Sequence, residues 1–489
     1  MSSLVSTFFL VLLLLLLSAT ANAVSWAKHL ETVQVARQGL LQAVPWAQEL
    51  RVLNGPGHRL SPAQSALTDC ITLYEDAEPR LARTVSRNFS HDDVVTWLSA
   101  ALAGHTTCLD GLRERGVPFE AQRAQNLTRA IREALAVHGA DGSRRRRKRK
   151  VGRRPGLNNV GDNLASWDSE KSKADFVVAQ DGSGNYRTIN EAVGALGRLG
   201  QNRPERVVVH VKSGVYREKV EIGRDLKDIM FVGDGIDKTV VTGNQNVQDG
   251  ATTLNSATFG VSGDGFWARD MTFENTAGPH KHQAVALRVN SDLSVFYRCS
   301  FKGYQDTLFV HSLRQFYREC QIHGTIDFIF GDAAAVLQNC DIFVRRPMDH
   351  QSNMITAQGR DDQNENTGIS ILNSRVVPSS EFRDVAGGFK SYLGRPWKKY
   401  SRTVFFKTDL DGLVDEKGWK EWDGDFALAT LYYAEYMNTG GGASTRNRVR
   451  WPGFHVLSDA NEANKFAVRN FIGGADWIPA TGVPFWADL

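Results

Sequence analysis

The spacing of apolar residues changes along the chain, from a helical period near the N-terminus to short strands further on. After the capping box of residues 61–64 (SPAQ), apolar residues recur three and four positions apart as far as Tyr74. A second capping pattern, Ser90-x-x-Asp93, precedes another apolar stripe. We therefore predict that residues 24–140 form a small all-α helical bundle.

The chain after residue 174 consists of short apolar strands separated by glycine and asparagine. The segment FYRC that ends at Cys299 recurs as FYREC ending at Cys320, and Cys340 follows, so the three cysteines are 21 and 20 residues apart. An apolar residue stands two positions after each cysteine. Equal columns at this period predict a stacked β-solenoid with one coil per repeat. The same column accommodates Met271 with Phe273 and Ser374 with Val376, after longer insertions.

Five cysteines are too few for a disulfide framework. Cys70 and Cys108 lie within the stripes of two successive helices, and in a secreted bundle we expect them to pair; the alternative is two buried free thiols. Cys299 and Cys320 also have two interpretations. They stack as small buried hydrophobes, which we favour, or they form a disulfide, since adjacent strands are about 4.8 Å apart and disulfides tolerate Cα separations down to about 4.4 Å.

The composition is 42% hydrophobic and 23% charged, which excludes a disordered or collagen-like chain. The formal charge of +4 is unevenly distributed: residues 1–154 carry 21 basic and 13 acidic residues, whereas residues 155–489 carry 37 and 41. The excess lies mainly in the RRRRKRK run of residues 144–150. Because one short segment makes the chain basic, we do not expect a nucleic-acid-binding domain.

The N-terminus has the features of a secretory signal peptide. Residues 8–17 (FFLVLLLLLL) form an apolar run of ten, and residues 21–23 (ANA) are a small-residue cleavage pattern. A membrane anchor needs about 20 apolar residues, more than this run contains. We therefore predict a signal peptide over residues 1–23, a secreted protein without a stable membrane anchor, and glycosylation at the sequons of Asn88 and Asn126.

The repeat places two carboxylates side by side. Asp306 follows Cys299 by seven residues and Asp327 follows Cys320 by seven, so they share a register on adjacent coils. Two carboxylates about 5 Å apart cannot both ionise cheaply, which suits one acid with one nucleophile or base. Gln305 lies 22 residues before Asp327, and Gln283 lies 22 residues before Gln305. Their amides can donate hydrogen bonds to an oxyanion.

A second segment whose side chains suit catalysis or substrate binding is LGRPW, residues 393–397. Arg395 would keep one carboxylate of the pair ionised and oriented, and Trp397 suits the apolar face of a sugar. The sequence has no Cys/His cluster with metal-ligand spacing, so we expect no metal site.

Several segments resemble, in their usual order, the signature segments of plant pectin methylesterases. The resemblance covers residues 174–489 and implies a right-handed parallel β-helix, which the repeat supports independently. The preceding helical region resembles the inhibitor domain that many plant members carry as a pro-region. The matching segments are GVYRE from residue 214, QAVAL from 283, GYQDTL from 303, GTIDFIFG from 324, LGRPW from 393, YYAEYMNTG from 432 and WPG from 451.

The resemblance implies a role for each candidate residue. Asp327 would be the nucleophile, Asp306 the proton donor and later the base, and Gln305 with Gln283 the stabilisers of the tetrahedral intermediate. The implied reaction is hydrolysis of methyl-esterified homogalacturonan (pectin) in the cell wall to pectate and methanol, without a metal or organic cofactor. The implied substrate-binding residues are Thr253, Gln283, Arg395 and Trp397.

The sequence departs from the family's pattern at two places. The inhibitor-like region has only Cys70 and Cys108, and lacks the family's first cysteine pair. In the catalytic region, Ser374 stands where many relatives have a cysteine able to pair with Cys340. We therefore expect Cys340 to be a free thiol.

Residues 141–173 are predicted as a linker between the pro-region (24–140) and the catalytic domain (174–489). Nine of the eleven residues 144–154 are basic. A run of this kind is a target for a processing protease, whose cut would end intramolecular inhibition by the pro-region. The alternative is that the run is retained as a tether to the acidic wall polymer.

Two other functions fit parts of the pattern. Carboxylates about 5 Å apart also suit a retaining glycosidase on the same polymer, although an oxocarbenium-like transition state needs no oxyanion donors, so the paired glutamines favour the esterase. The third hypothesis is a non-enzymatic role in which residues 24–140 bind and inhibit an esterase.

Overall fold

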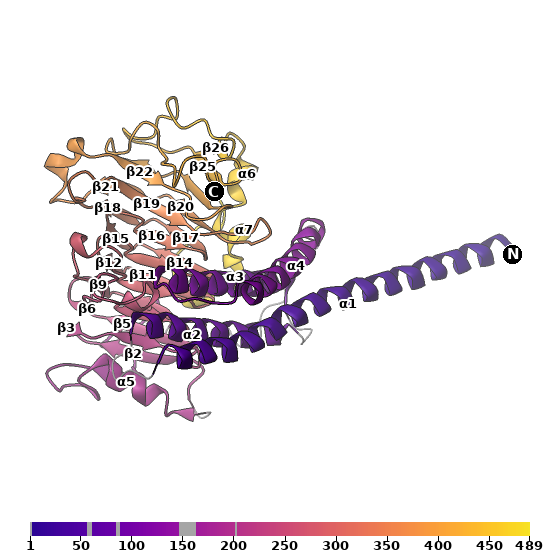
Figure 1. The fold of residues 1–489 in the computed structure, drawn as a ribbon, viewed down its shortest axis with the longest axis horizontal. Coiled ribbons are helices and arrows are strands. Elements are labelled where there is room, and N and C mark those ends of the chain that lie inside the picture. The colour runs from indigo at the N-terminus through magenta and orange to yellow at the C-terminus, as the bar shows by residue number, and fades with distance from the viewer. Residues whose placement is uncertain (1, 56–60, 85–88, 146–162, 201–202) are drawn as a thin grey trace.

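The computed structural model of the chain describes residues 2–55, 61–84, 89–145, 163–200 and 203–489, with side chains from residue 28 onward and up to residue 139 in the fourth helix. Four long helices come first, and a stack of strands follows (Figure 1). The helices are α1 (Ser2–Leu53), α2 (Pro62–Arg83), α3 (His91–Glu114) and α4 (Ala121–Arg145). In the described part of the chain, no helix is both long and apolar enough to cross a membrane.

The predicted helix starts are confirmed. Ser61 and Ser90 cap α2 and α3, and each capping box is closed from both sides, by Gln64 and by Asp93. The apolar stripes of the four helices meet in one buried cluster. Cys70 and Cys108 are bonded across α2 and α3, as expected, with their Cα atoms 4.6 Å apart.

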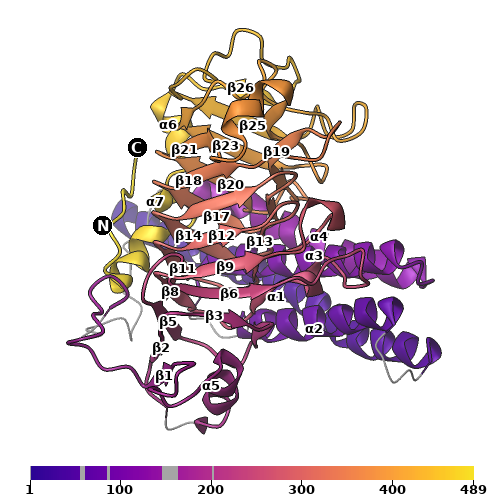
Figure 2. The ribbon, with the colours of Figure 1, turned by 90° about the vertical axis from the view of Figure 1, so that its left-hand side faces the viewer.

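The strands of the described residues form three parallel sheets of a β-helix, confirming the predicted fold class. From β2 to β22, each coil contributes one strand to each sheet in turn (Figure 2). Sheet A contains β1 (Phe176–Val178), β2 (Val207–Val211), β5 (Ile229–Gly233), β8 (Trp267–Arg269), β11 (Ser294–Tyr297), β14 (Arg314–Arg318), β17 (Ala334–Gln338), β20 (Gly368–Leu372), β23 (Arg402–Phe406), β25 (Tyr432–Tyr436) and β26 (Phe454–Val456). Sheet B contains β3 (Gly214–Arg217), β6 (Thr239–Gly243), β9 (Thr272–Asn275), β12 (Ser300–Lys302), β15 (Gln321–Gly324), β18 (Asp341–Val344), β21 (Arg375–Pro378) and β24 (Asp409–Leu410). Sheet C contains β4 (Val220–Ile222), β7 (Phe259–Val261), β10 (Leu287–Val289), β13 (Leu308–Val310), β16 (Ile329–Gly331), β19 (Asn353–Gln358) and β22 (Ser391–Gly394). Short helices α5 (Ile189–Leu196), α6 (Ala460–Asn464) and α7 (Val468–Phe471) lie at the two ends of the domain's sequence.

The repeat in the sequence corresponds to the corner between sheets A and B. A residue with left-handed backbone stands at this corner in successive coils, for example Arg298 (φ 50°), Glu319 (φ 55°) and Asn339 (φ 57°). The next residue in each coil is one of the repeated cysteines, and it points into the apolar interior. The regular spacing therefore fixes the register, in which Phe301 pairs with Ile322 and Ile322 with Ile342.

Cys299, Cys320 and Cys340 are free and buried, so the stacking interpretation holds and the bridged alternative does not. Ser374 occupies the next place in the column. Its hydroxyl accepts a hydrogen bond of 3.1 Å from the backbone N–H of Cys340.

The segment predicted as a linker is shorter than its expected bounds of 141–173. α4 continues to Arg145, and residues from 163 onward pack on the β-helix, where Leu164 and Trp167 are buried. Arg269 fixes them by donating to the backbone carbonyls of residues 164, 165 and 167. These apolar side chains have a partner on the β-helix, which the local polar composition did not reveal. The basic run beyond Arg145 lies outside the described residues, as do Asn88 and the side chains of the predicted signal peptide.

The helices lie against one flank of the β-helix, beside its lower and middle coils (Figures 1 and 2). Leu254, Val285, Phe309, Phe330 and Ala357 of the β-helix belong to the same buried apolar cluster as the helix side chains. The two domains therefore share a continuous core at this flank.

Candidate functional site

The structure brings the two predicted carboxylates together in the turns that lead from sheet B to sheet C. Asp306 precedes β13 and Asp327 precedes β16, and Leu308 pairs with Ile329 in the register of these strands. The backbone N–H of Asp306 donates to the carbonyl oxygen of residue 326 at 3.0 Å, which joins the two turns. Both side chains are buried, with 6% and 5% exposed.

Both aspartates have left-handed backbone, with φ of 64° at Asp306 and 50° at Asp327. An L-residue adopts this conformation at a cost, and in this fold it recurs at the turns of successive coils, as at Arg298 and Glu319. The turn positions the two carboxylates at the same point of adjacent coils.

Arg395 forms a bidentate ion pair with Asp327. Its Nε lies 2.9 Å from Oδ1 and its Nη2 lies 2.6 Å from Oδ2. Arg395 follows β22, two strands away from β16 in sheet C, so the contact joins residues 68 positions apart in sequence. The fork geometry holds the Asp327 carboxylate in one orientation.

The electrostatics distinguish the two carboxylates. Burial and, after it, the Asp327 charge raise the pKa of Asp306 well above its usual range, and Arg395 only partly opposes them. Burial also raises the pKa of Asp327, but the hydrogen bonds and charge of Arg395 favour its ionised form. Asp306 is therefore the member of the pair that keeps a proton, and Asp327 is the anion.

The predicted glutamines lie beside this pair. Gln305 directly precedes Asp306, and Gln283 lies in the corresponding turn of the coil before it, where the backbone N–H of Ala284 donates to the Gln305 carbonyl at 3.2 Å. Both glutamines are half-buried. Thr253 directly precedes the short helix Leu254–Ser256, and Trp397 is half-buried against the shared apolar cluster.

The C-terminal end of α3 covers this site. Lys398, next to Trp397, pairs with Asp110 of α3 at 2.5 Å, and Arg115 donates to the carbonyl of Ala251. The charge of Glu114 is one of the causes that raise the pKa of Asp306. The helical domain therefore shields the candidate site from solvent on this side.

Buried ion pairs hold the helical domain in place against the β-helix. Arg80 of α2 donates to Asp264 at 2.8 Å and to the carbonyls of residues 262 and 290. Arg314 of the β-helix lies between Asp93 of α3, at 2.8 Å, and Asp292, at 2.7 Å. Removing one partner of such a pair leaves an uncompensated buried charge, which costs about 3–5 kcal/mol.

Asp69 makes the contact between the domains sensitive to pH. Its carboxylate accepts hydrogen bonds from Thr252 and Asn255, and burial raises its pKa to about 7, opposed by the Thr252 hydrogen bond and by the charges of Arg288 and Lys219. All of these partners belong to the β-helix, so the carboxyl group becomes exposed when the domains separate.

We predict that raising the pH weakens the association of the two domains. The docked state retains the Asp69 proton up to a pH of about 7, whereas the separated domain loses it near the ordinary value of 3.8, so the stabilisation is complete below 3.8 and is lost as the pH rises through about 7. The dissociation constant of the chain cut in its linker should increase by up to about 10³-fold over this range. Calorimetry at several pH values measures this. Asp69→Asn should flatten the dependence, and Glu133→Gln, at an exposed carboxylate of α4, should not.

Sequence reasoning missed several side chains of the site. The Trp422 ring lies 4.3 Å from the guanidinium carbon of Arg395 and is 37% exposed. The rings of Phe309 and Phe330 stack with their centroids 4.2 Å apart, and the centroids of Phe330 and Trp397 are 6.0 Å apart. The aromatic stretch GWKEW at residues 418–422 was the available signal for Trp422, but it has no period that places it.

The described residues contain no group of three or more His, Cys, Asp or Glu side chains that could hold a metal ion. The site thus consists of a carboxylate pair, an arginine and two amides beside several aromatic side chains. Such an arrangement can supply a nucleophile, an acid and oxyanion donors.

Comparison with known families agrees with the division into two domains. The profile of the family described as pectinesterase matches residues 175–475, and that of the plant invertase/pectin methylesterase inhibitors matches residues 16–137.

Individual relatives show similarity over the whole chain. A probable pectinesterase/pectinesterase inhibitor from Arabidopsis thaliana, numbered 36, is 54% identical over 514 residues, covering 99% of each chain. Pectinesterase 2 from Citrus sinensis is 48% identical and covers 97% of this chain and 91% of its own. Among solved structures, the pectin methylesterase from carrot is 53% identical, with a TM-score of 0.64 over 66% of this chain and 100% of the carrot chain.

Proposed function

The chain belongs to the pectinesterase family, as a pectin methylesterase preceded by an inhibitor-type domain, and on this premise we propose that Asp327 is its nucleophile and Asp306 its acid and base. The observation that carries the assignment is the bidentate Arg395–Asp327 pair beside a second buried carboxyl group. Arg395 keeps Asp327 anionic and in a fixed orientation, while Asp306 retains the proton that the leaving group needs. Membership in this family sets the glycosidase alternative aside.

The first half of the reaction forms an acyl-enzyme. An oxygen of Asp327 attacks the carbonyl carbon of the methyl ester, and the amides of Gln283 and Gln305 donate to the oxyanion that develops. As the bond to the methoxy oxygen breaks, Asp306 transfers its proton to that oxygen, and methanol leaves. In the second half, ionised Asp306 takes a proton from water, whose oxygen attacks the acyl carbon and releases Asp327 with the free galacturonate carboxylate.

The helical domain is proposed to inhibit this site until it is released. The observations in support are the end of α3 over the carboxylate pair, the shared apolar cluster, and the buried ion pairs of Arg80 and Arg314. We retain as proposals the signal peptide (1–23), secretion to the cell wall, glycosylation at Asn88 and Asn126, and cleavage by a processing protease in the basic run.

Methanol release from highly esterified pectin tests the proposed activity. The chain cut between residues 145 and 155 should release methanol in proportion to the new carboxylates it forms, without new reducing ends. Appearance of reducing ends without methanol would instead support glycosidic cleavage and overturn the assignment of the carboxylates.

Gln305→Ala is expected to lower kcat by about 10²-fold to 10³-fold while changing KM little, because an oxyanion donor acts mainly in the transition state. Gln283→Ala should behave in the same way. Initial rates of methanol release at several pectin concentrations separate the two parameters. A change confined to KM would make these glutamines ordinary substrate contacts. Gln321→Ala, at a half-buried glutamine of β15 outside the site, serves as the control.

A further inference from the structure

The turn that carries Gln305 is joined to the following coil through its backbone. The N–H of Asp306 donates to the carbonyl oxygen of residue 326 at 3.0 Å, and the N–H of Thr325 donates to the carbonyl oxygen of Tyr304 at 2.9 Å. These bonds hold the turn from one side. They fix the backbone of Asp306 directly, whereas Gln305 lies between the two bonded residues.

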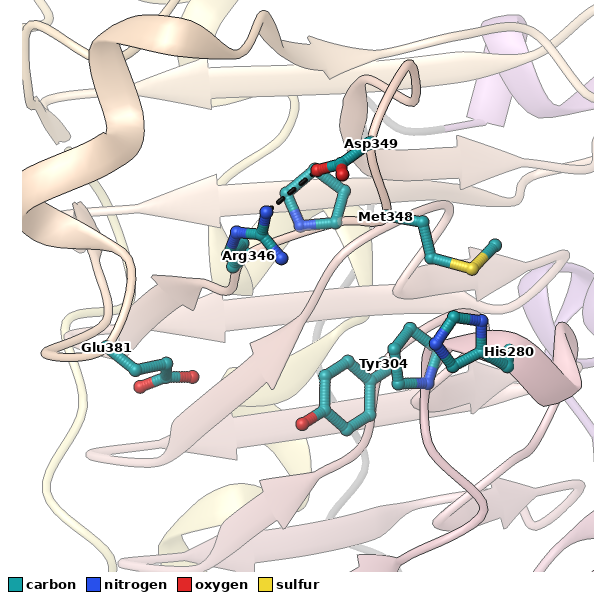
Figure 3. Close-up of a pocket in the computed structure, with 8 residues that line it drawn as sticks. His280, Tyr304, Arg346, Met348, Asp349 and Glu381 are labelled. Carbon is teal, nitrogen blue, oxygen red and sulfur yellow. Dashed lines mark hydrogen bonds and ion pairs between the residues drawn. The ribbon is translucent and has the colours of Figure 1, made fainter.

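The other side of this turn is not fixed by close packing. The Tyr304 side chain lines a cavity of about 430 Å³, which Met348 and Glu381 also line (Figure 3). In that view, the phenol oxygen of Tyr304 points toward Glu381. The position of the residues just before Gln305 therefore depends on polar contacts made from this side.

Arg345 makes those contacts. Its Nη1 donates to the carbonyl oxygen of Gly303 at 3.0 Å, and its Nη2 donates to the phenol oxygen of Tyr304 at 2.8 Å. Its guanidinium carbon also lies 3.9 Å from the centroid of the Tyr304 ring. A planar guanidinium can make these three contacts together, which a lysine ammonium cannot. Arg345 thus fixes both the backbone and a side chain immediately before Gln305.

Arg345 is itself held at two points. It directly follows β18, and its backbone N–H donates to the carbonyl oxygen of Gly324 at 2.8 Å, at the end of β15. Its Nε donates to the carboxylate of Glu381 at 2.9 Å, in the loop after β21. One side chain therefore connects the turn of Gln305 to three later coils of the β-helix.

The exposure of this ion pair separates a role in positioning from a role in stability. The Arg345 side chain is 22% exposed and that of Glu381 is 49% exposed. An ion pair this exposed contributes little to the free energy of unfolding. Misplacing a catalytic group by about 1 Å, in contrast, can lower a rate by about 10²-fold.

We propose that Arg345 is a positioning residue for the oxyanion donor Gln305, and that Glu381 orients its guanidinium. The proposal rests on the proposed function and adds to it two residues that act through Gln305. The pKa of Asp306 is set mainly by burial and by the charges of Asp327 and Arg395. A change at Arg345 should therefore alter the rate without moving its dependence on pH.

Initial rates of methanol release by the chain cut between residues 145 and 155 test this role. Arg345→Ala should lower kcat by at least about tenfold and leave KM within about twofold, because the donor acts mainly in the transition state. Arg345→Lys should lower kcat by only about threefold, since its ammonium can still donate to the Gly303 carbonyl. The pH profile of kcat should keep its midpoints in both variants.

A double-mutant cycle shows whether the effect passes through Gln305. In the Gln305→Ala background, Arg345→Ala should lower kcat by less than about threefold, because the donor that it positions is gone. An undiminished loss in this background would overturn the proposal. So would a kcat of Arg345→Ala or of Arg345→Lys equal to that of the parent chain, an effect confined to KM, or a shifted pH profile.

Arg206→Ala is the matched control. Arg206 also combines an acidic partner, a backbone carbonyl and an aromatic ring: it pairs with Asp228 at 3.2 Å, donates to the carbonyl of Gly265 at 2.6 Å and lies 3.3 Å from the Trp267 ring centroid. Its replacement should leave kcat within about twofold of the parent value. An equal loss of kcat in Arg206→Ala and Arg345→Ala would reduce Arg345 to a structural residue.

The same measurements separate failure of this proposal from failure of the proposed function. If Gln305→Ala leaves kcat unchanged, its assignment as an oxyanion donor fails, and the positioning role fails with it. If Gln305→Ala lowers kcat and Arg345→Ala does not, only the positioning role is rejected. Melting temperatures show which variants are folded, and if Arg345→Ala is not, Arg345→Lys decides.

Discussion

Replacing Asp327 by asparagine is expected to lower kcat for methyl-ester hydrolysis by more than about 10³-fold, with little change in KM. The amide has nearly the volume of the carboxylate and still offers an oxygen to Arg395, so the turn that holds it should persist. What it lacks is the anionic oxygen that attacks the ester. Asp306 cannot substitute, because burial and its neighbours keep its pKa well above the usual range and Arg395 is not paired with it.

Single-turnover and steady-state methanol release by the cleaved chain measure this effect. Asp341→Asn is the matched control, since Asp341 pairs with Arg375 on β18 and β21, outside the site. Its kcat should stay within about twofold of the parent value. A kcat for Asp327→Asn above about a tenth of the parent value would mean less than about 1.4 kcal/mol of lost transition-state stabilisation, and would contradict the role of nucleophile.

Separating the helical domain from the β-helix is expected to raise esterase activity by on the order of 100-fold. A tethered domain has an effective concentration of about 1 mM, so a dissociation constant of about 10 μM would leave about one chain in a hundred open. Once the basic run is cut, dilution to nanomolar concentration removes this advantage and exposes the carboxylate pair. The expected increase therefore depends on dilution as well as on proteolysis.

A specific protease site placed between residues 146 and 154 allows both steps to be measured on one protein. Activity should increase only when the cut chain is diluted, together with separation of the domains in size-exclusion chromatography. Asp264→Ala should activate even the uncut chain, because it leaves Arg80 buried without its carboxylate partner. Asp237→Ala, which removes a partner of Lys302 outside the interface, should not. Unchanged activity after complete separation would reject inhibition and favour the basic run as a wall tether.

Much of the β-helix could be predicted because its contacts are periodic. Cys299, Cys320 and Cys340 repeat at one corner of successive coils, so their spacing sets which residues of neighbouring strands pair. The same register is sufficient to place Asp306 beside Asp327, because both residues follow their cysteine by seven positions. The helix starts at Ser61 and Ser90 could be predicted equally well, since a capping box is a contact between residues three positions apart.

The sequence by itself therefore determined the two domains, the coil period and the adjacency of the carboxylates, and it favoured the Cys70–Cys108 bond over two free thiols. Each of these follows from contacts within a helix pair or between neighbouring coils. Only the tertiary structure decided that Trp422 lies over Arg395, that residues from 163 onward pack on the β-helix, and that the end of α3 covers the site. These contacts join segments far apart in the sequence, such as Asp110 and Lys398, which are separated by 288 residues. They depend on the complementary shape and charge of surfaces that exist only once the separate elements have folded. Such contacts produce no periodic pattern in the sequence.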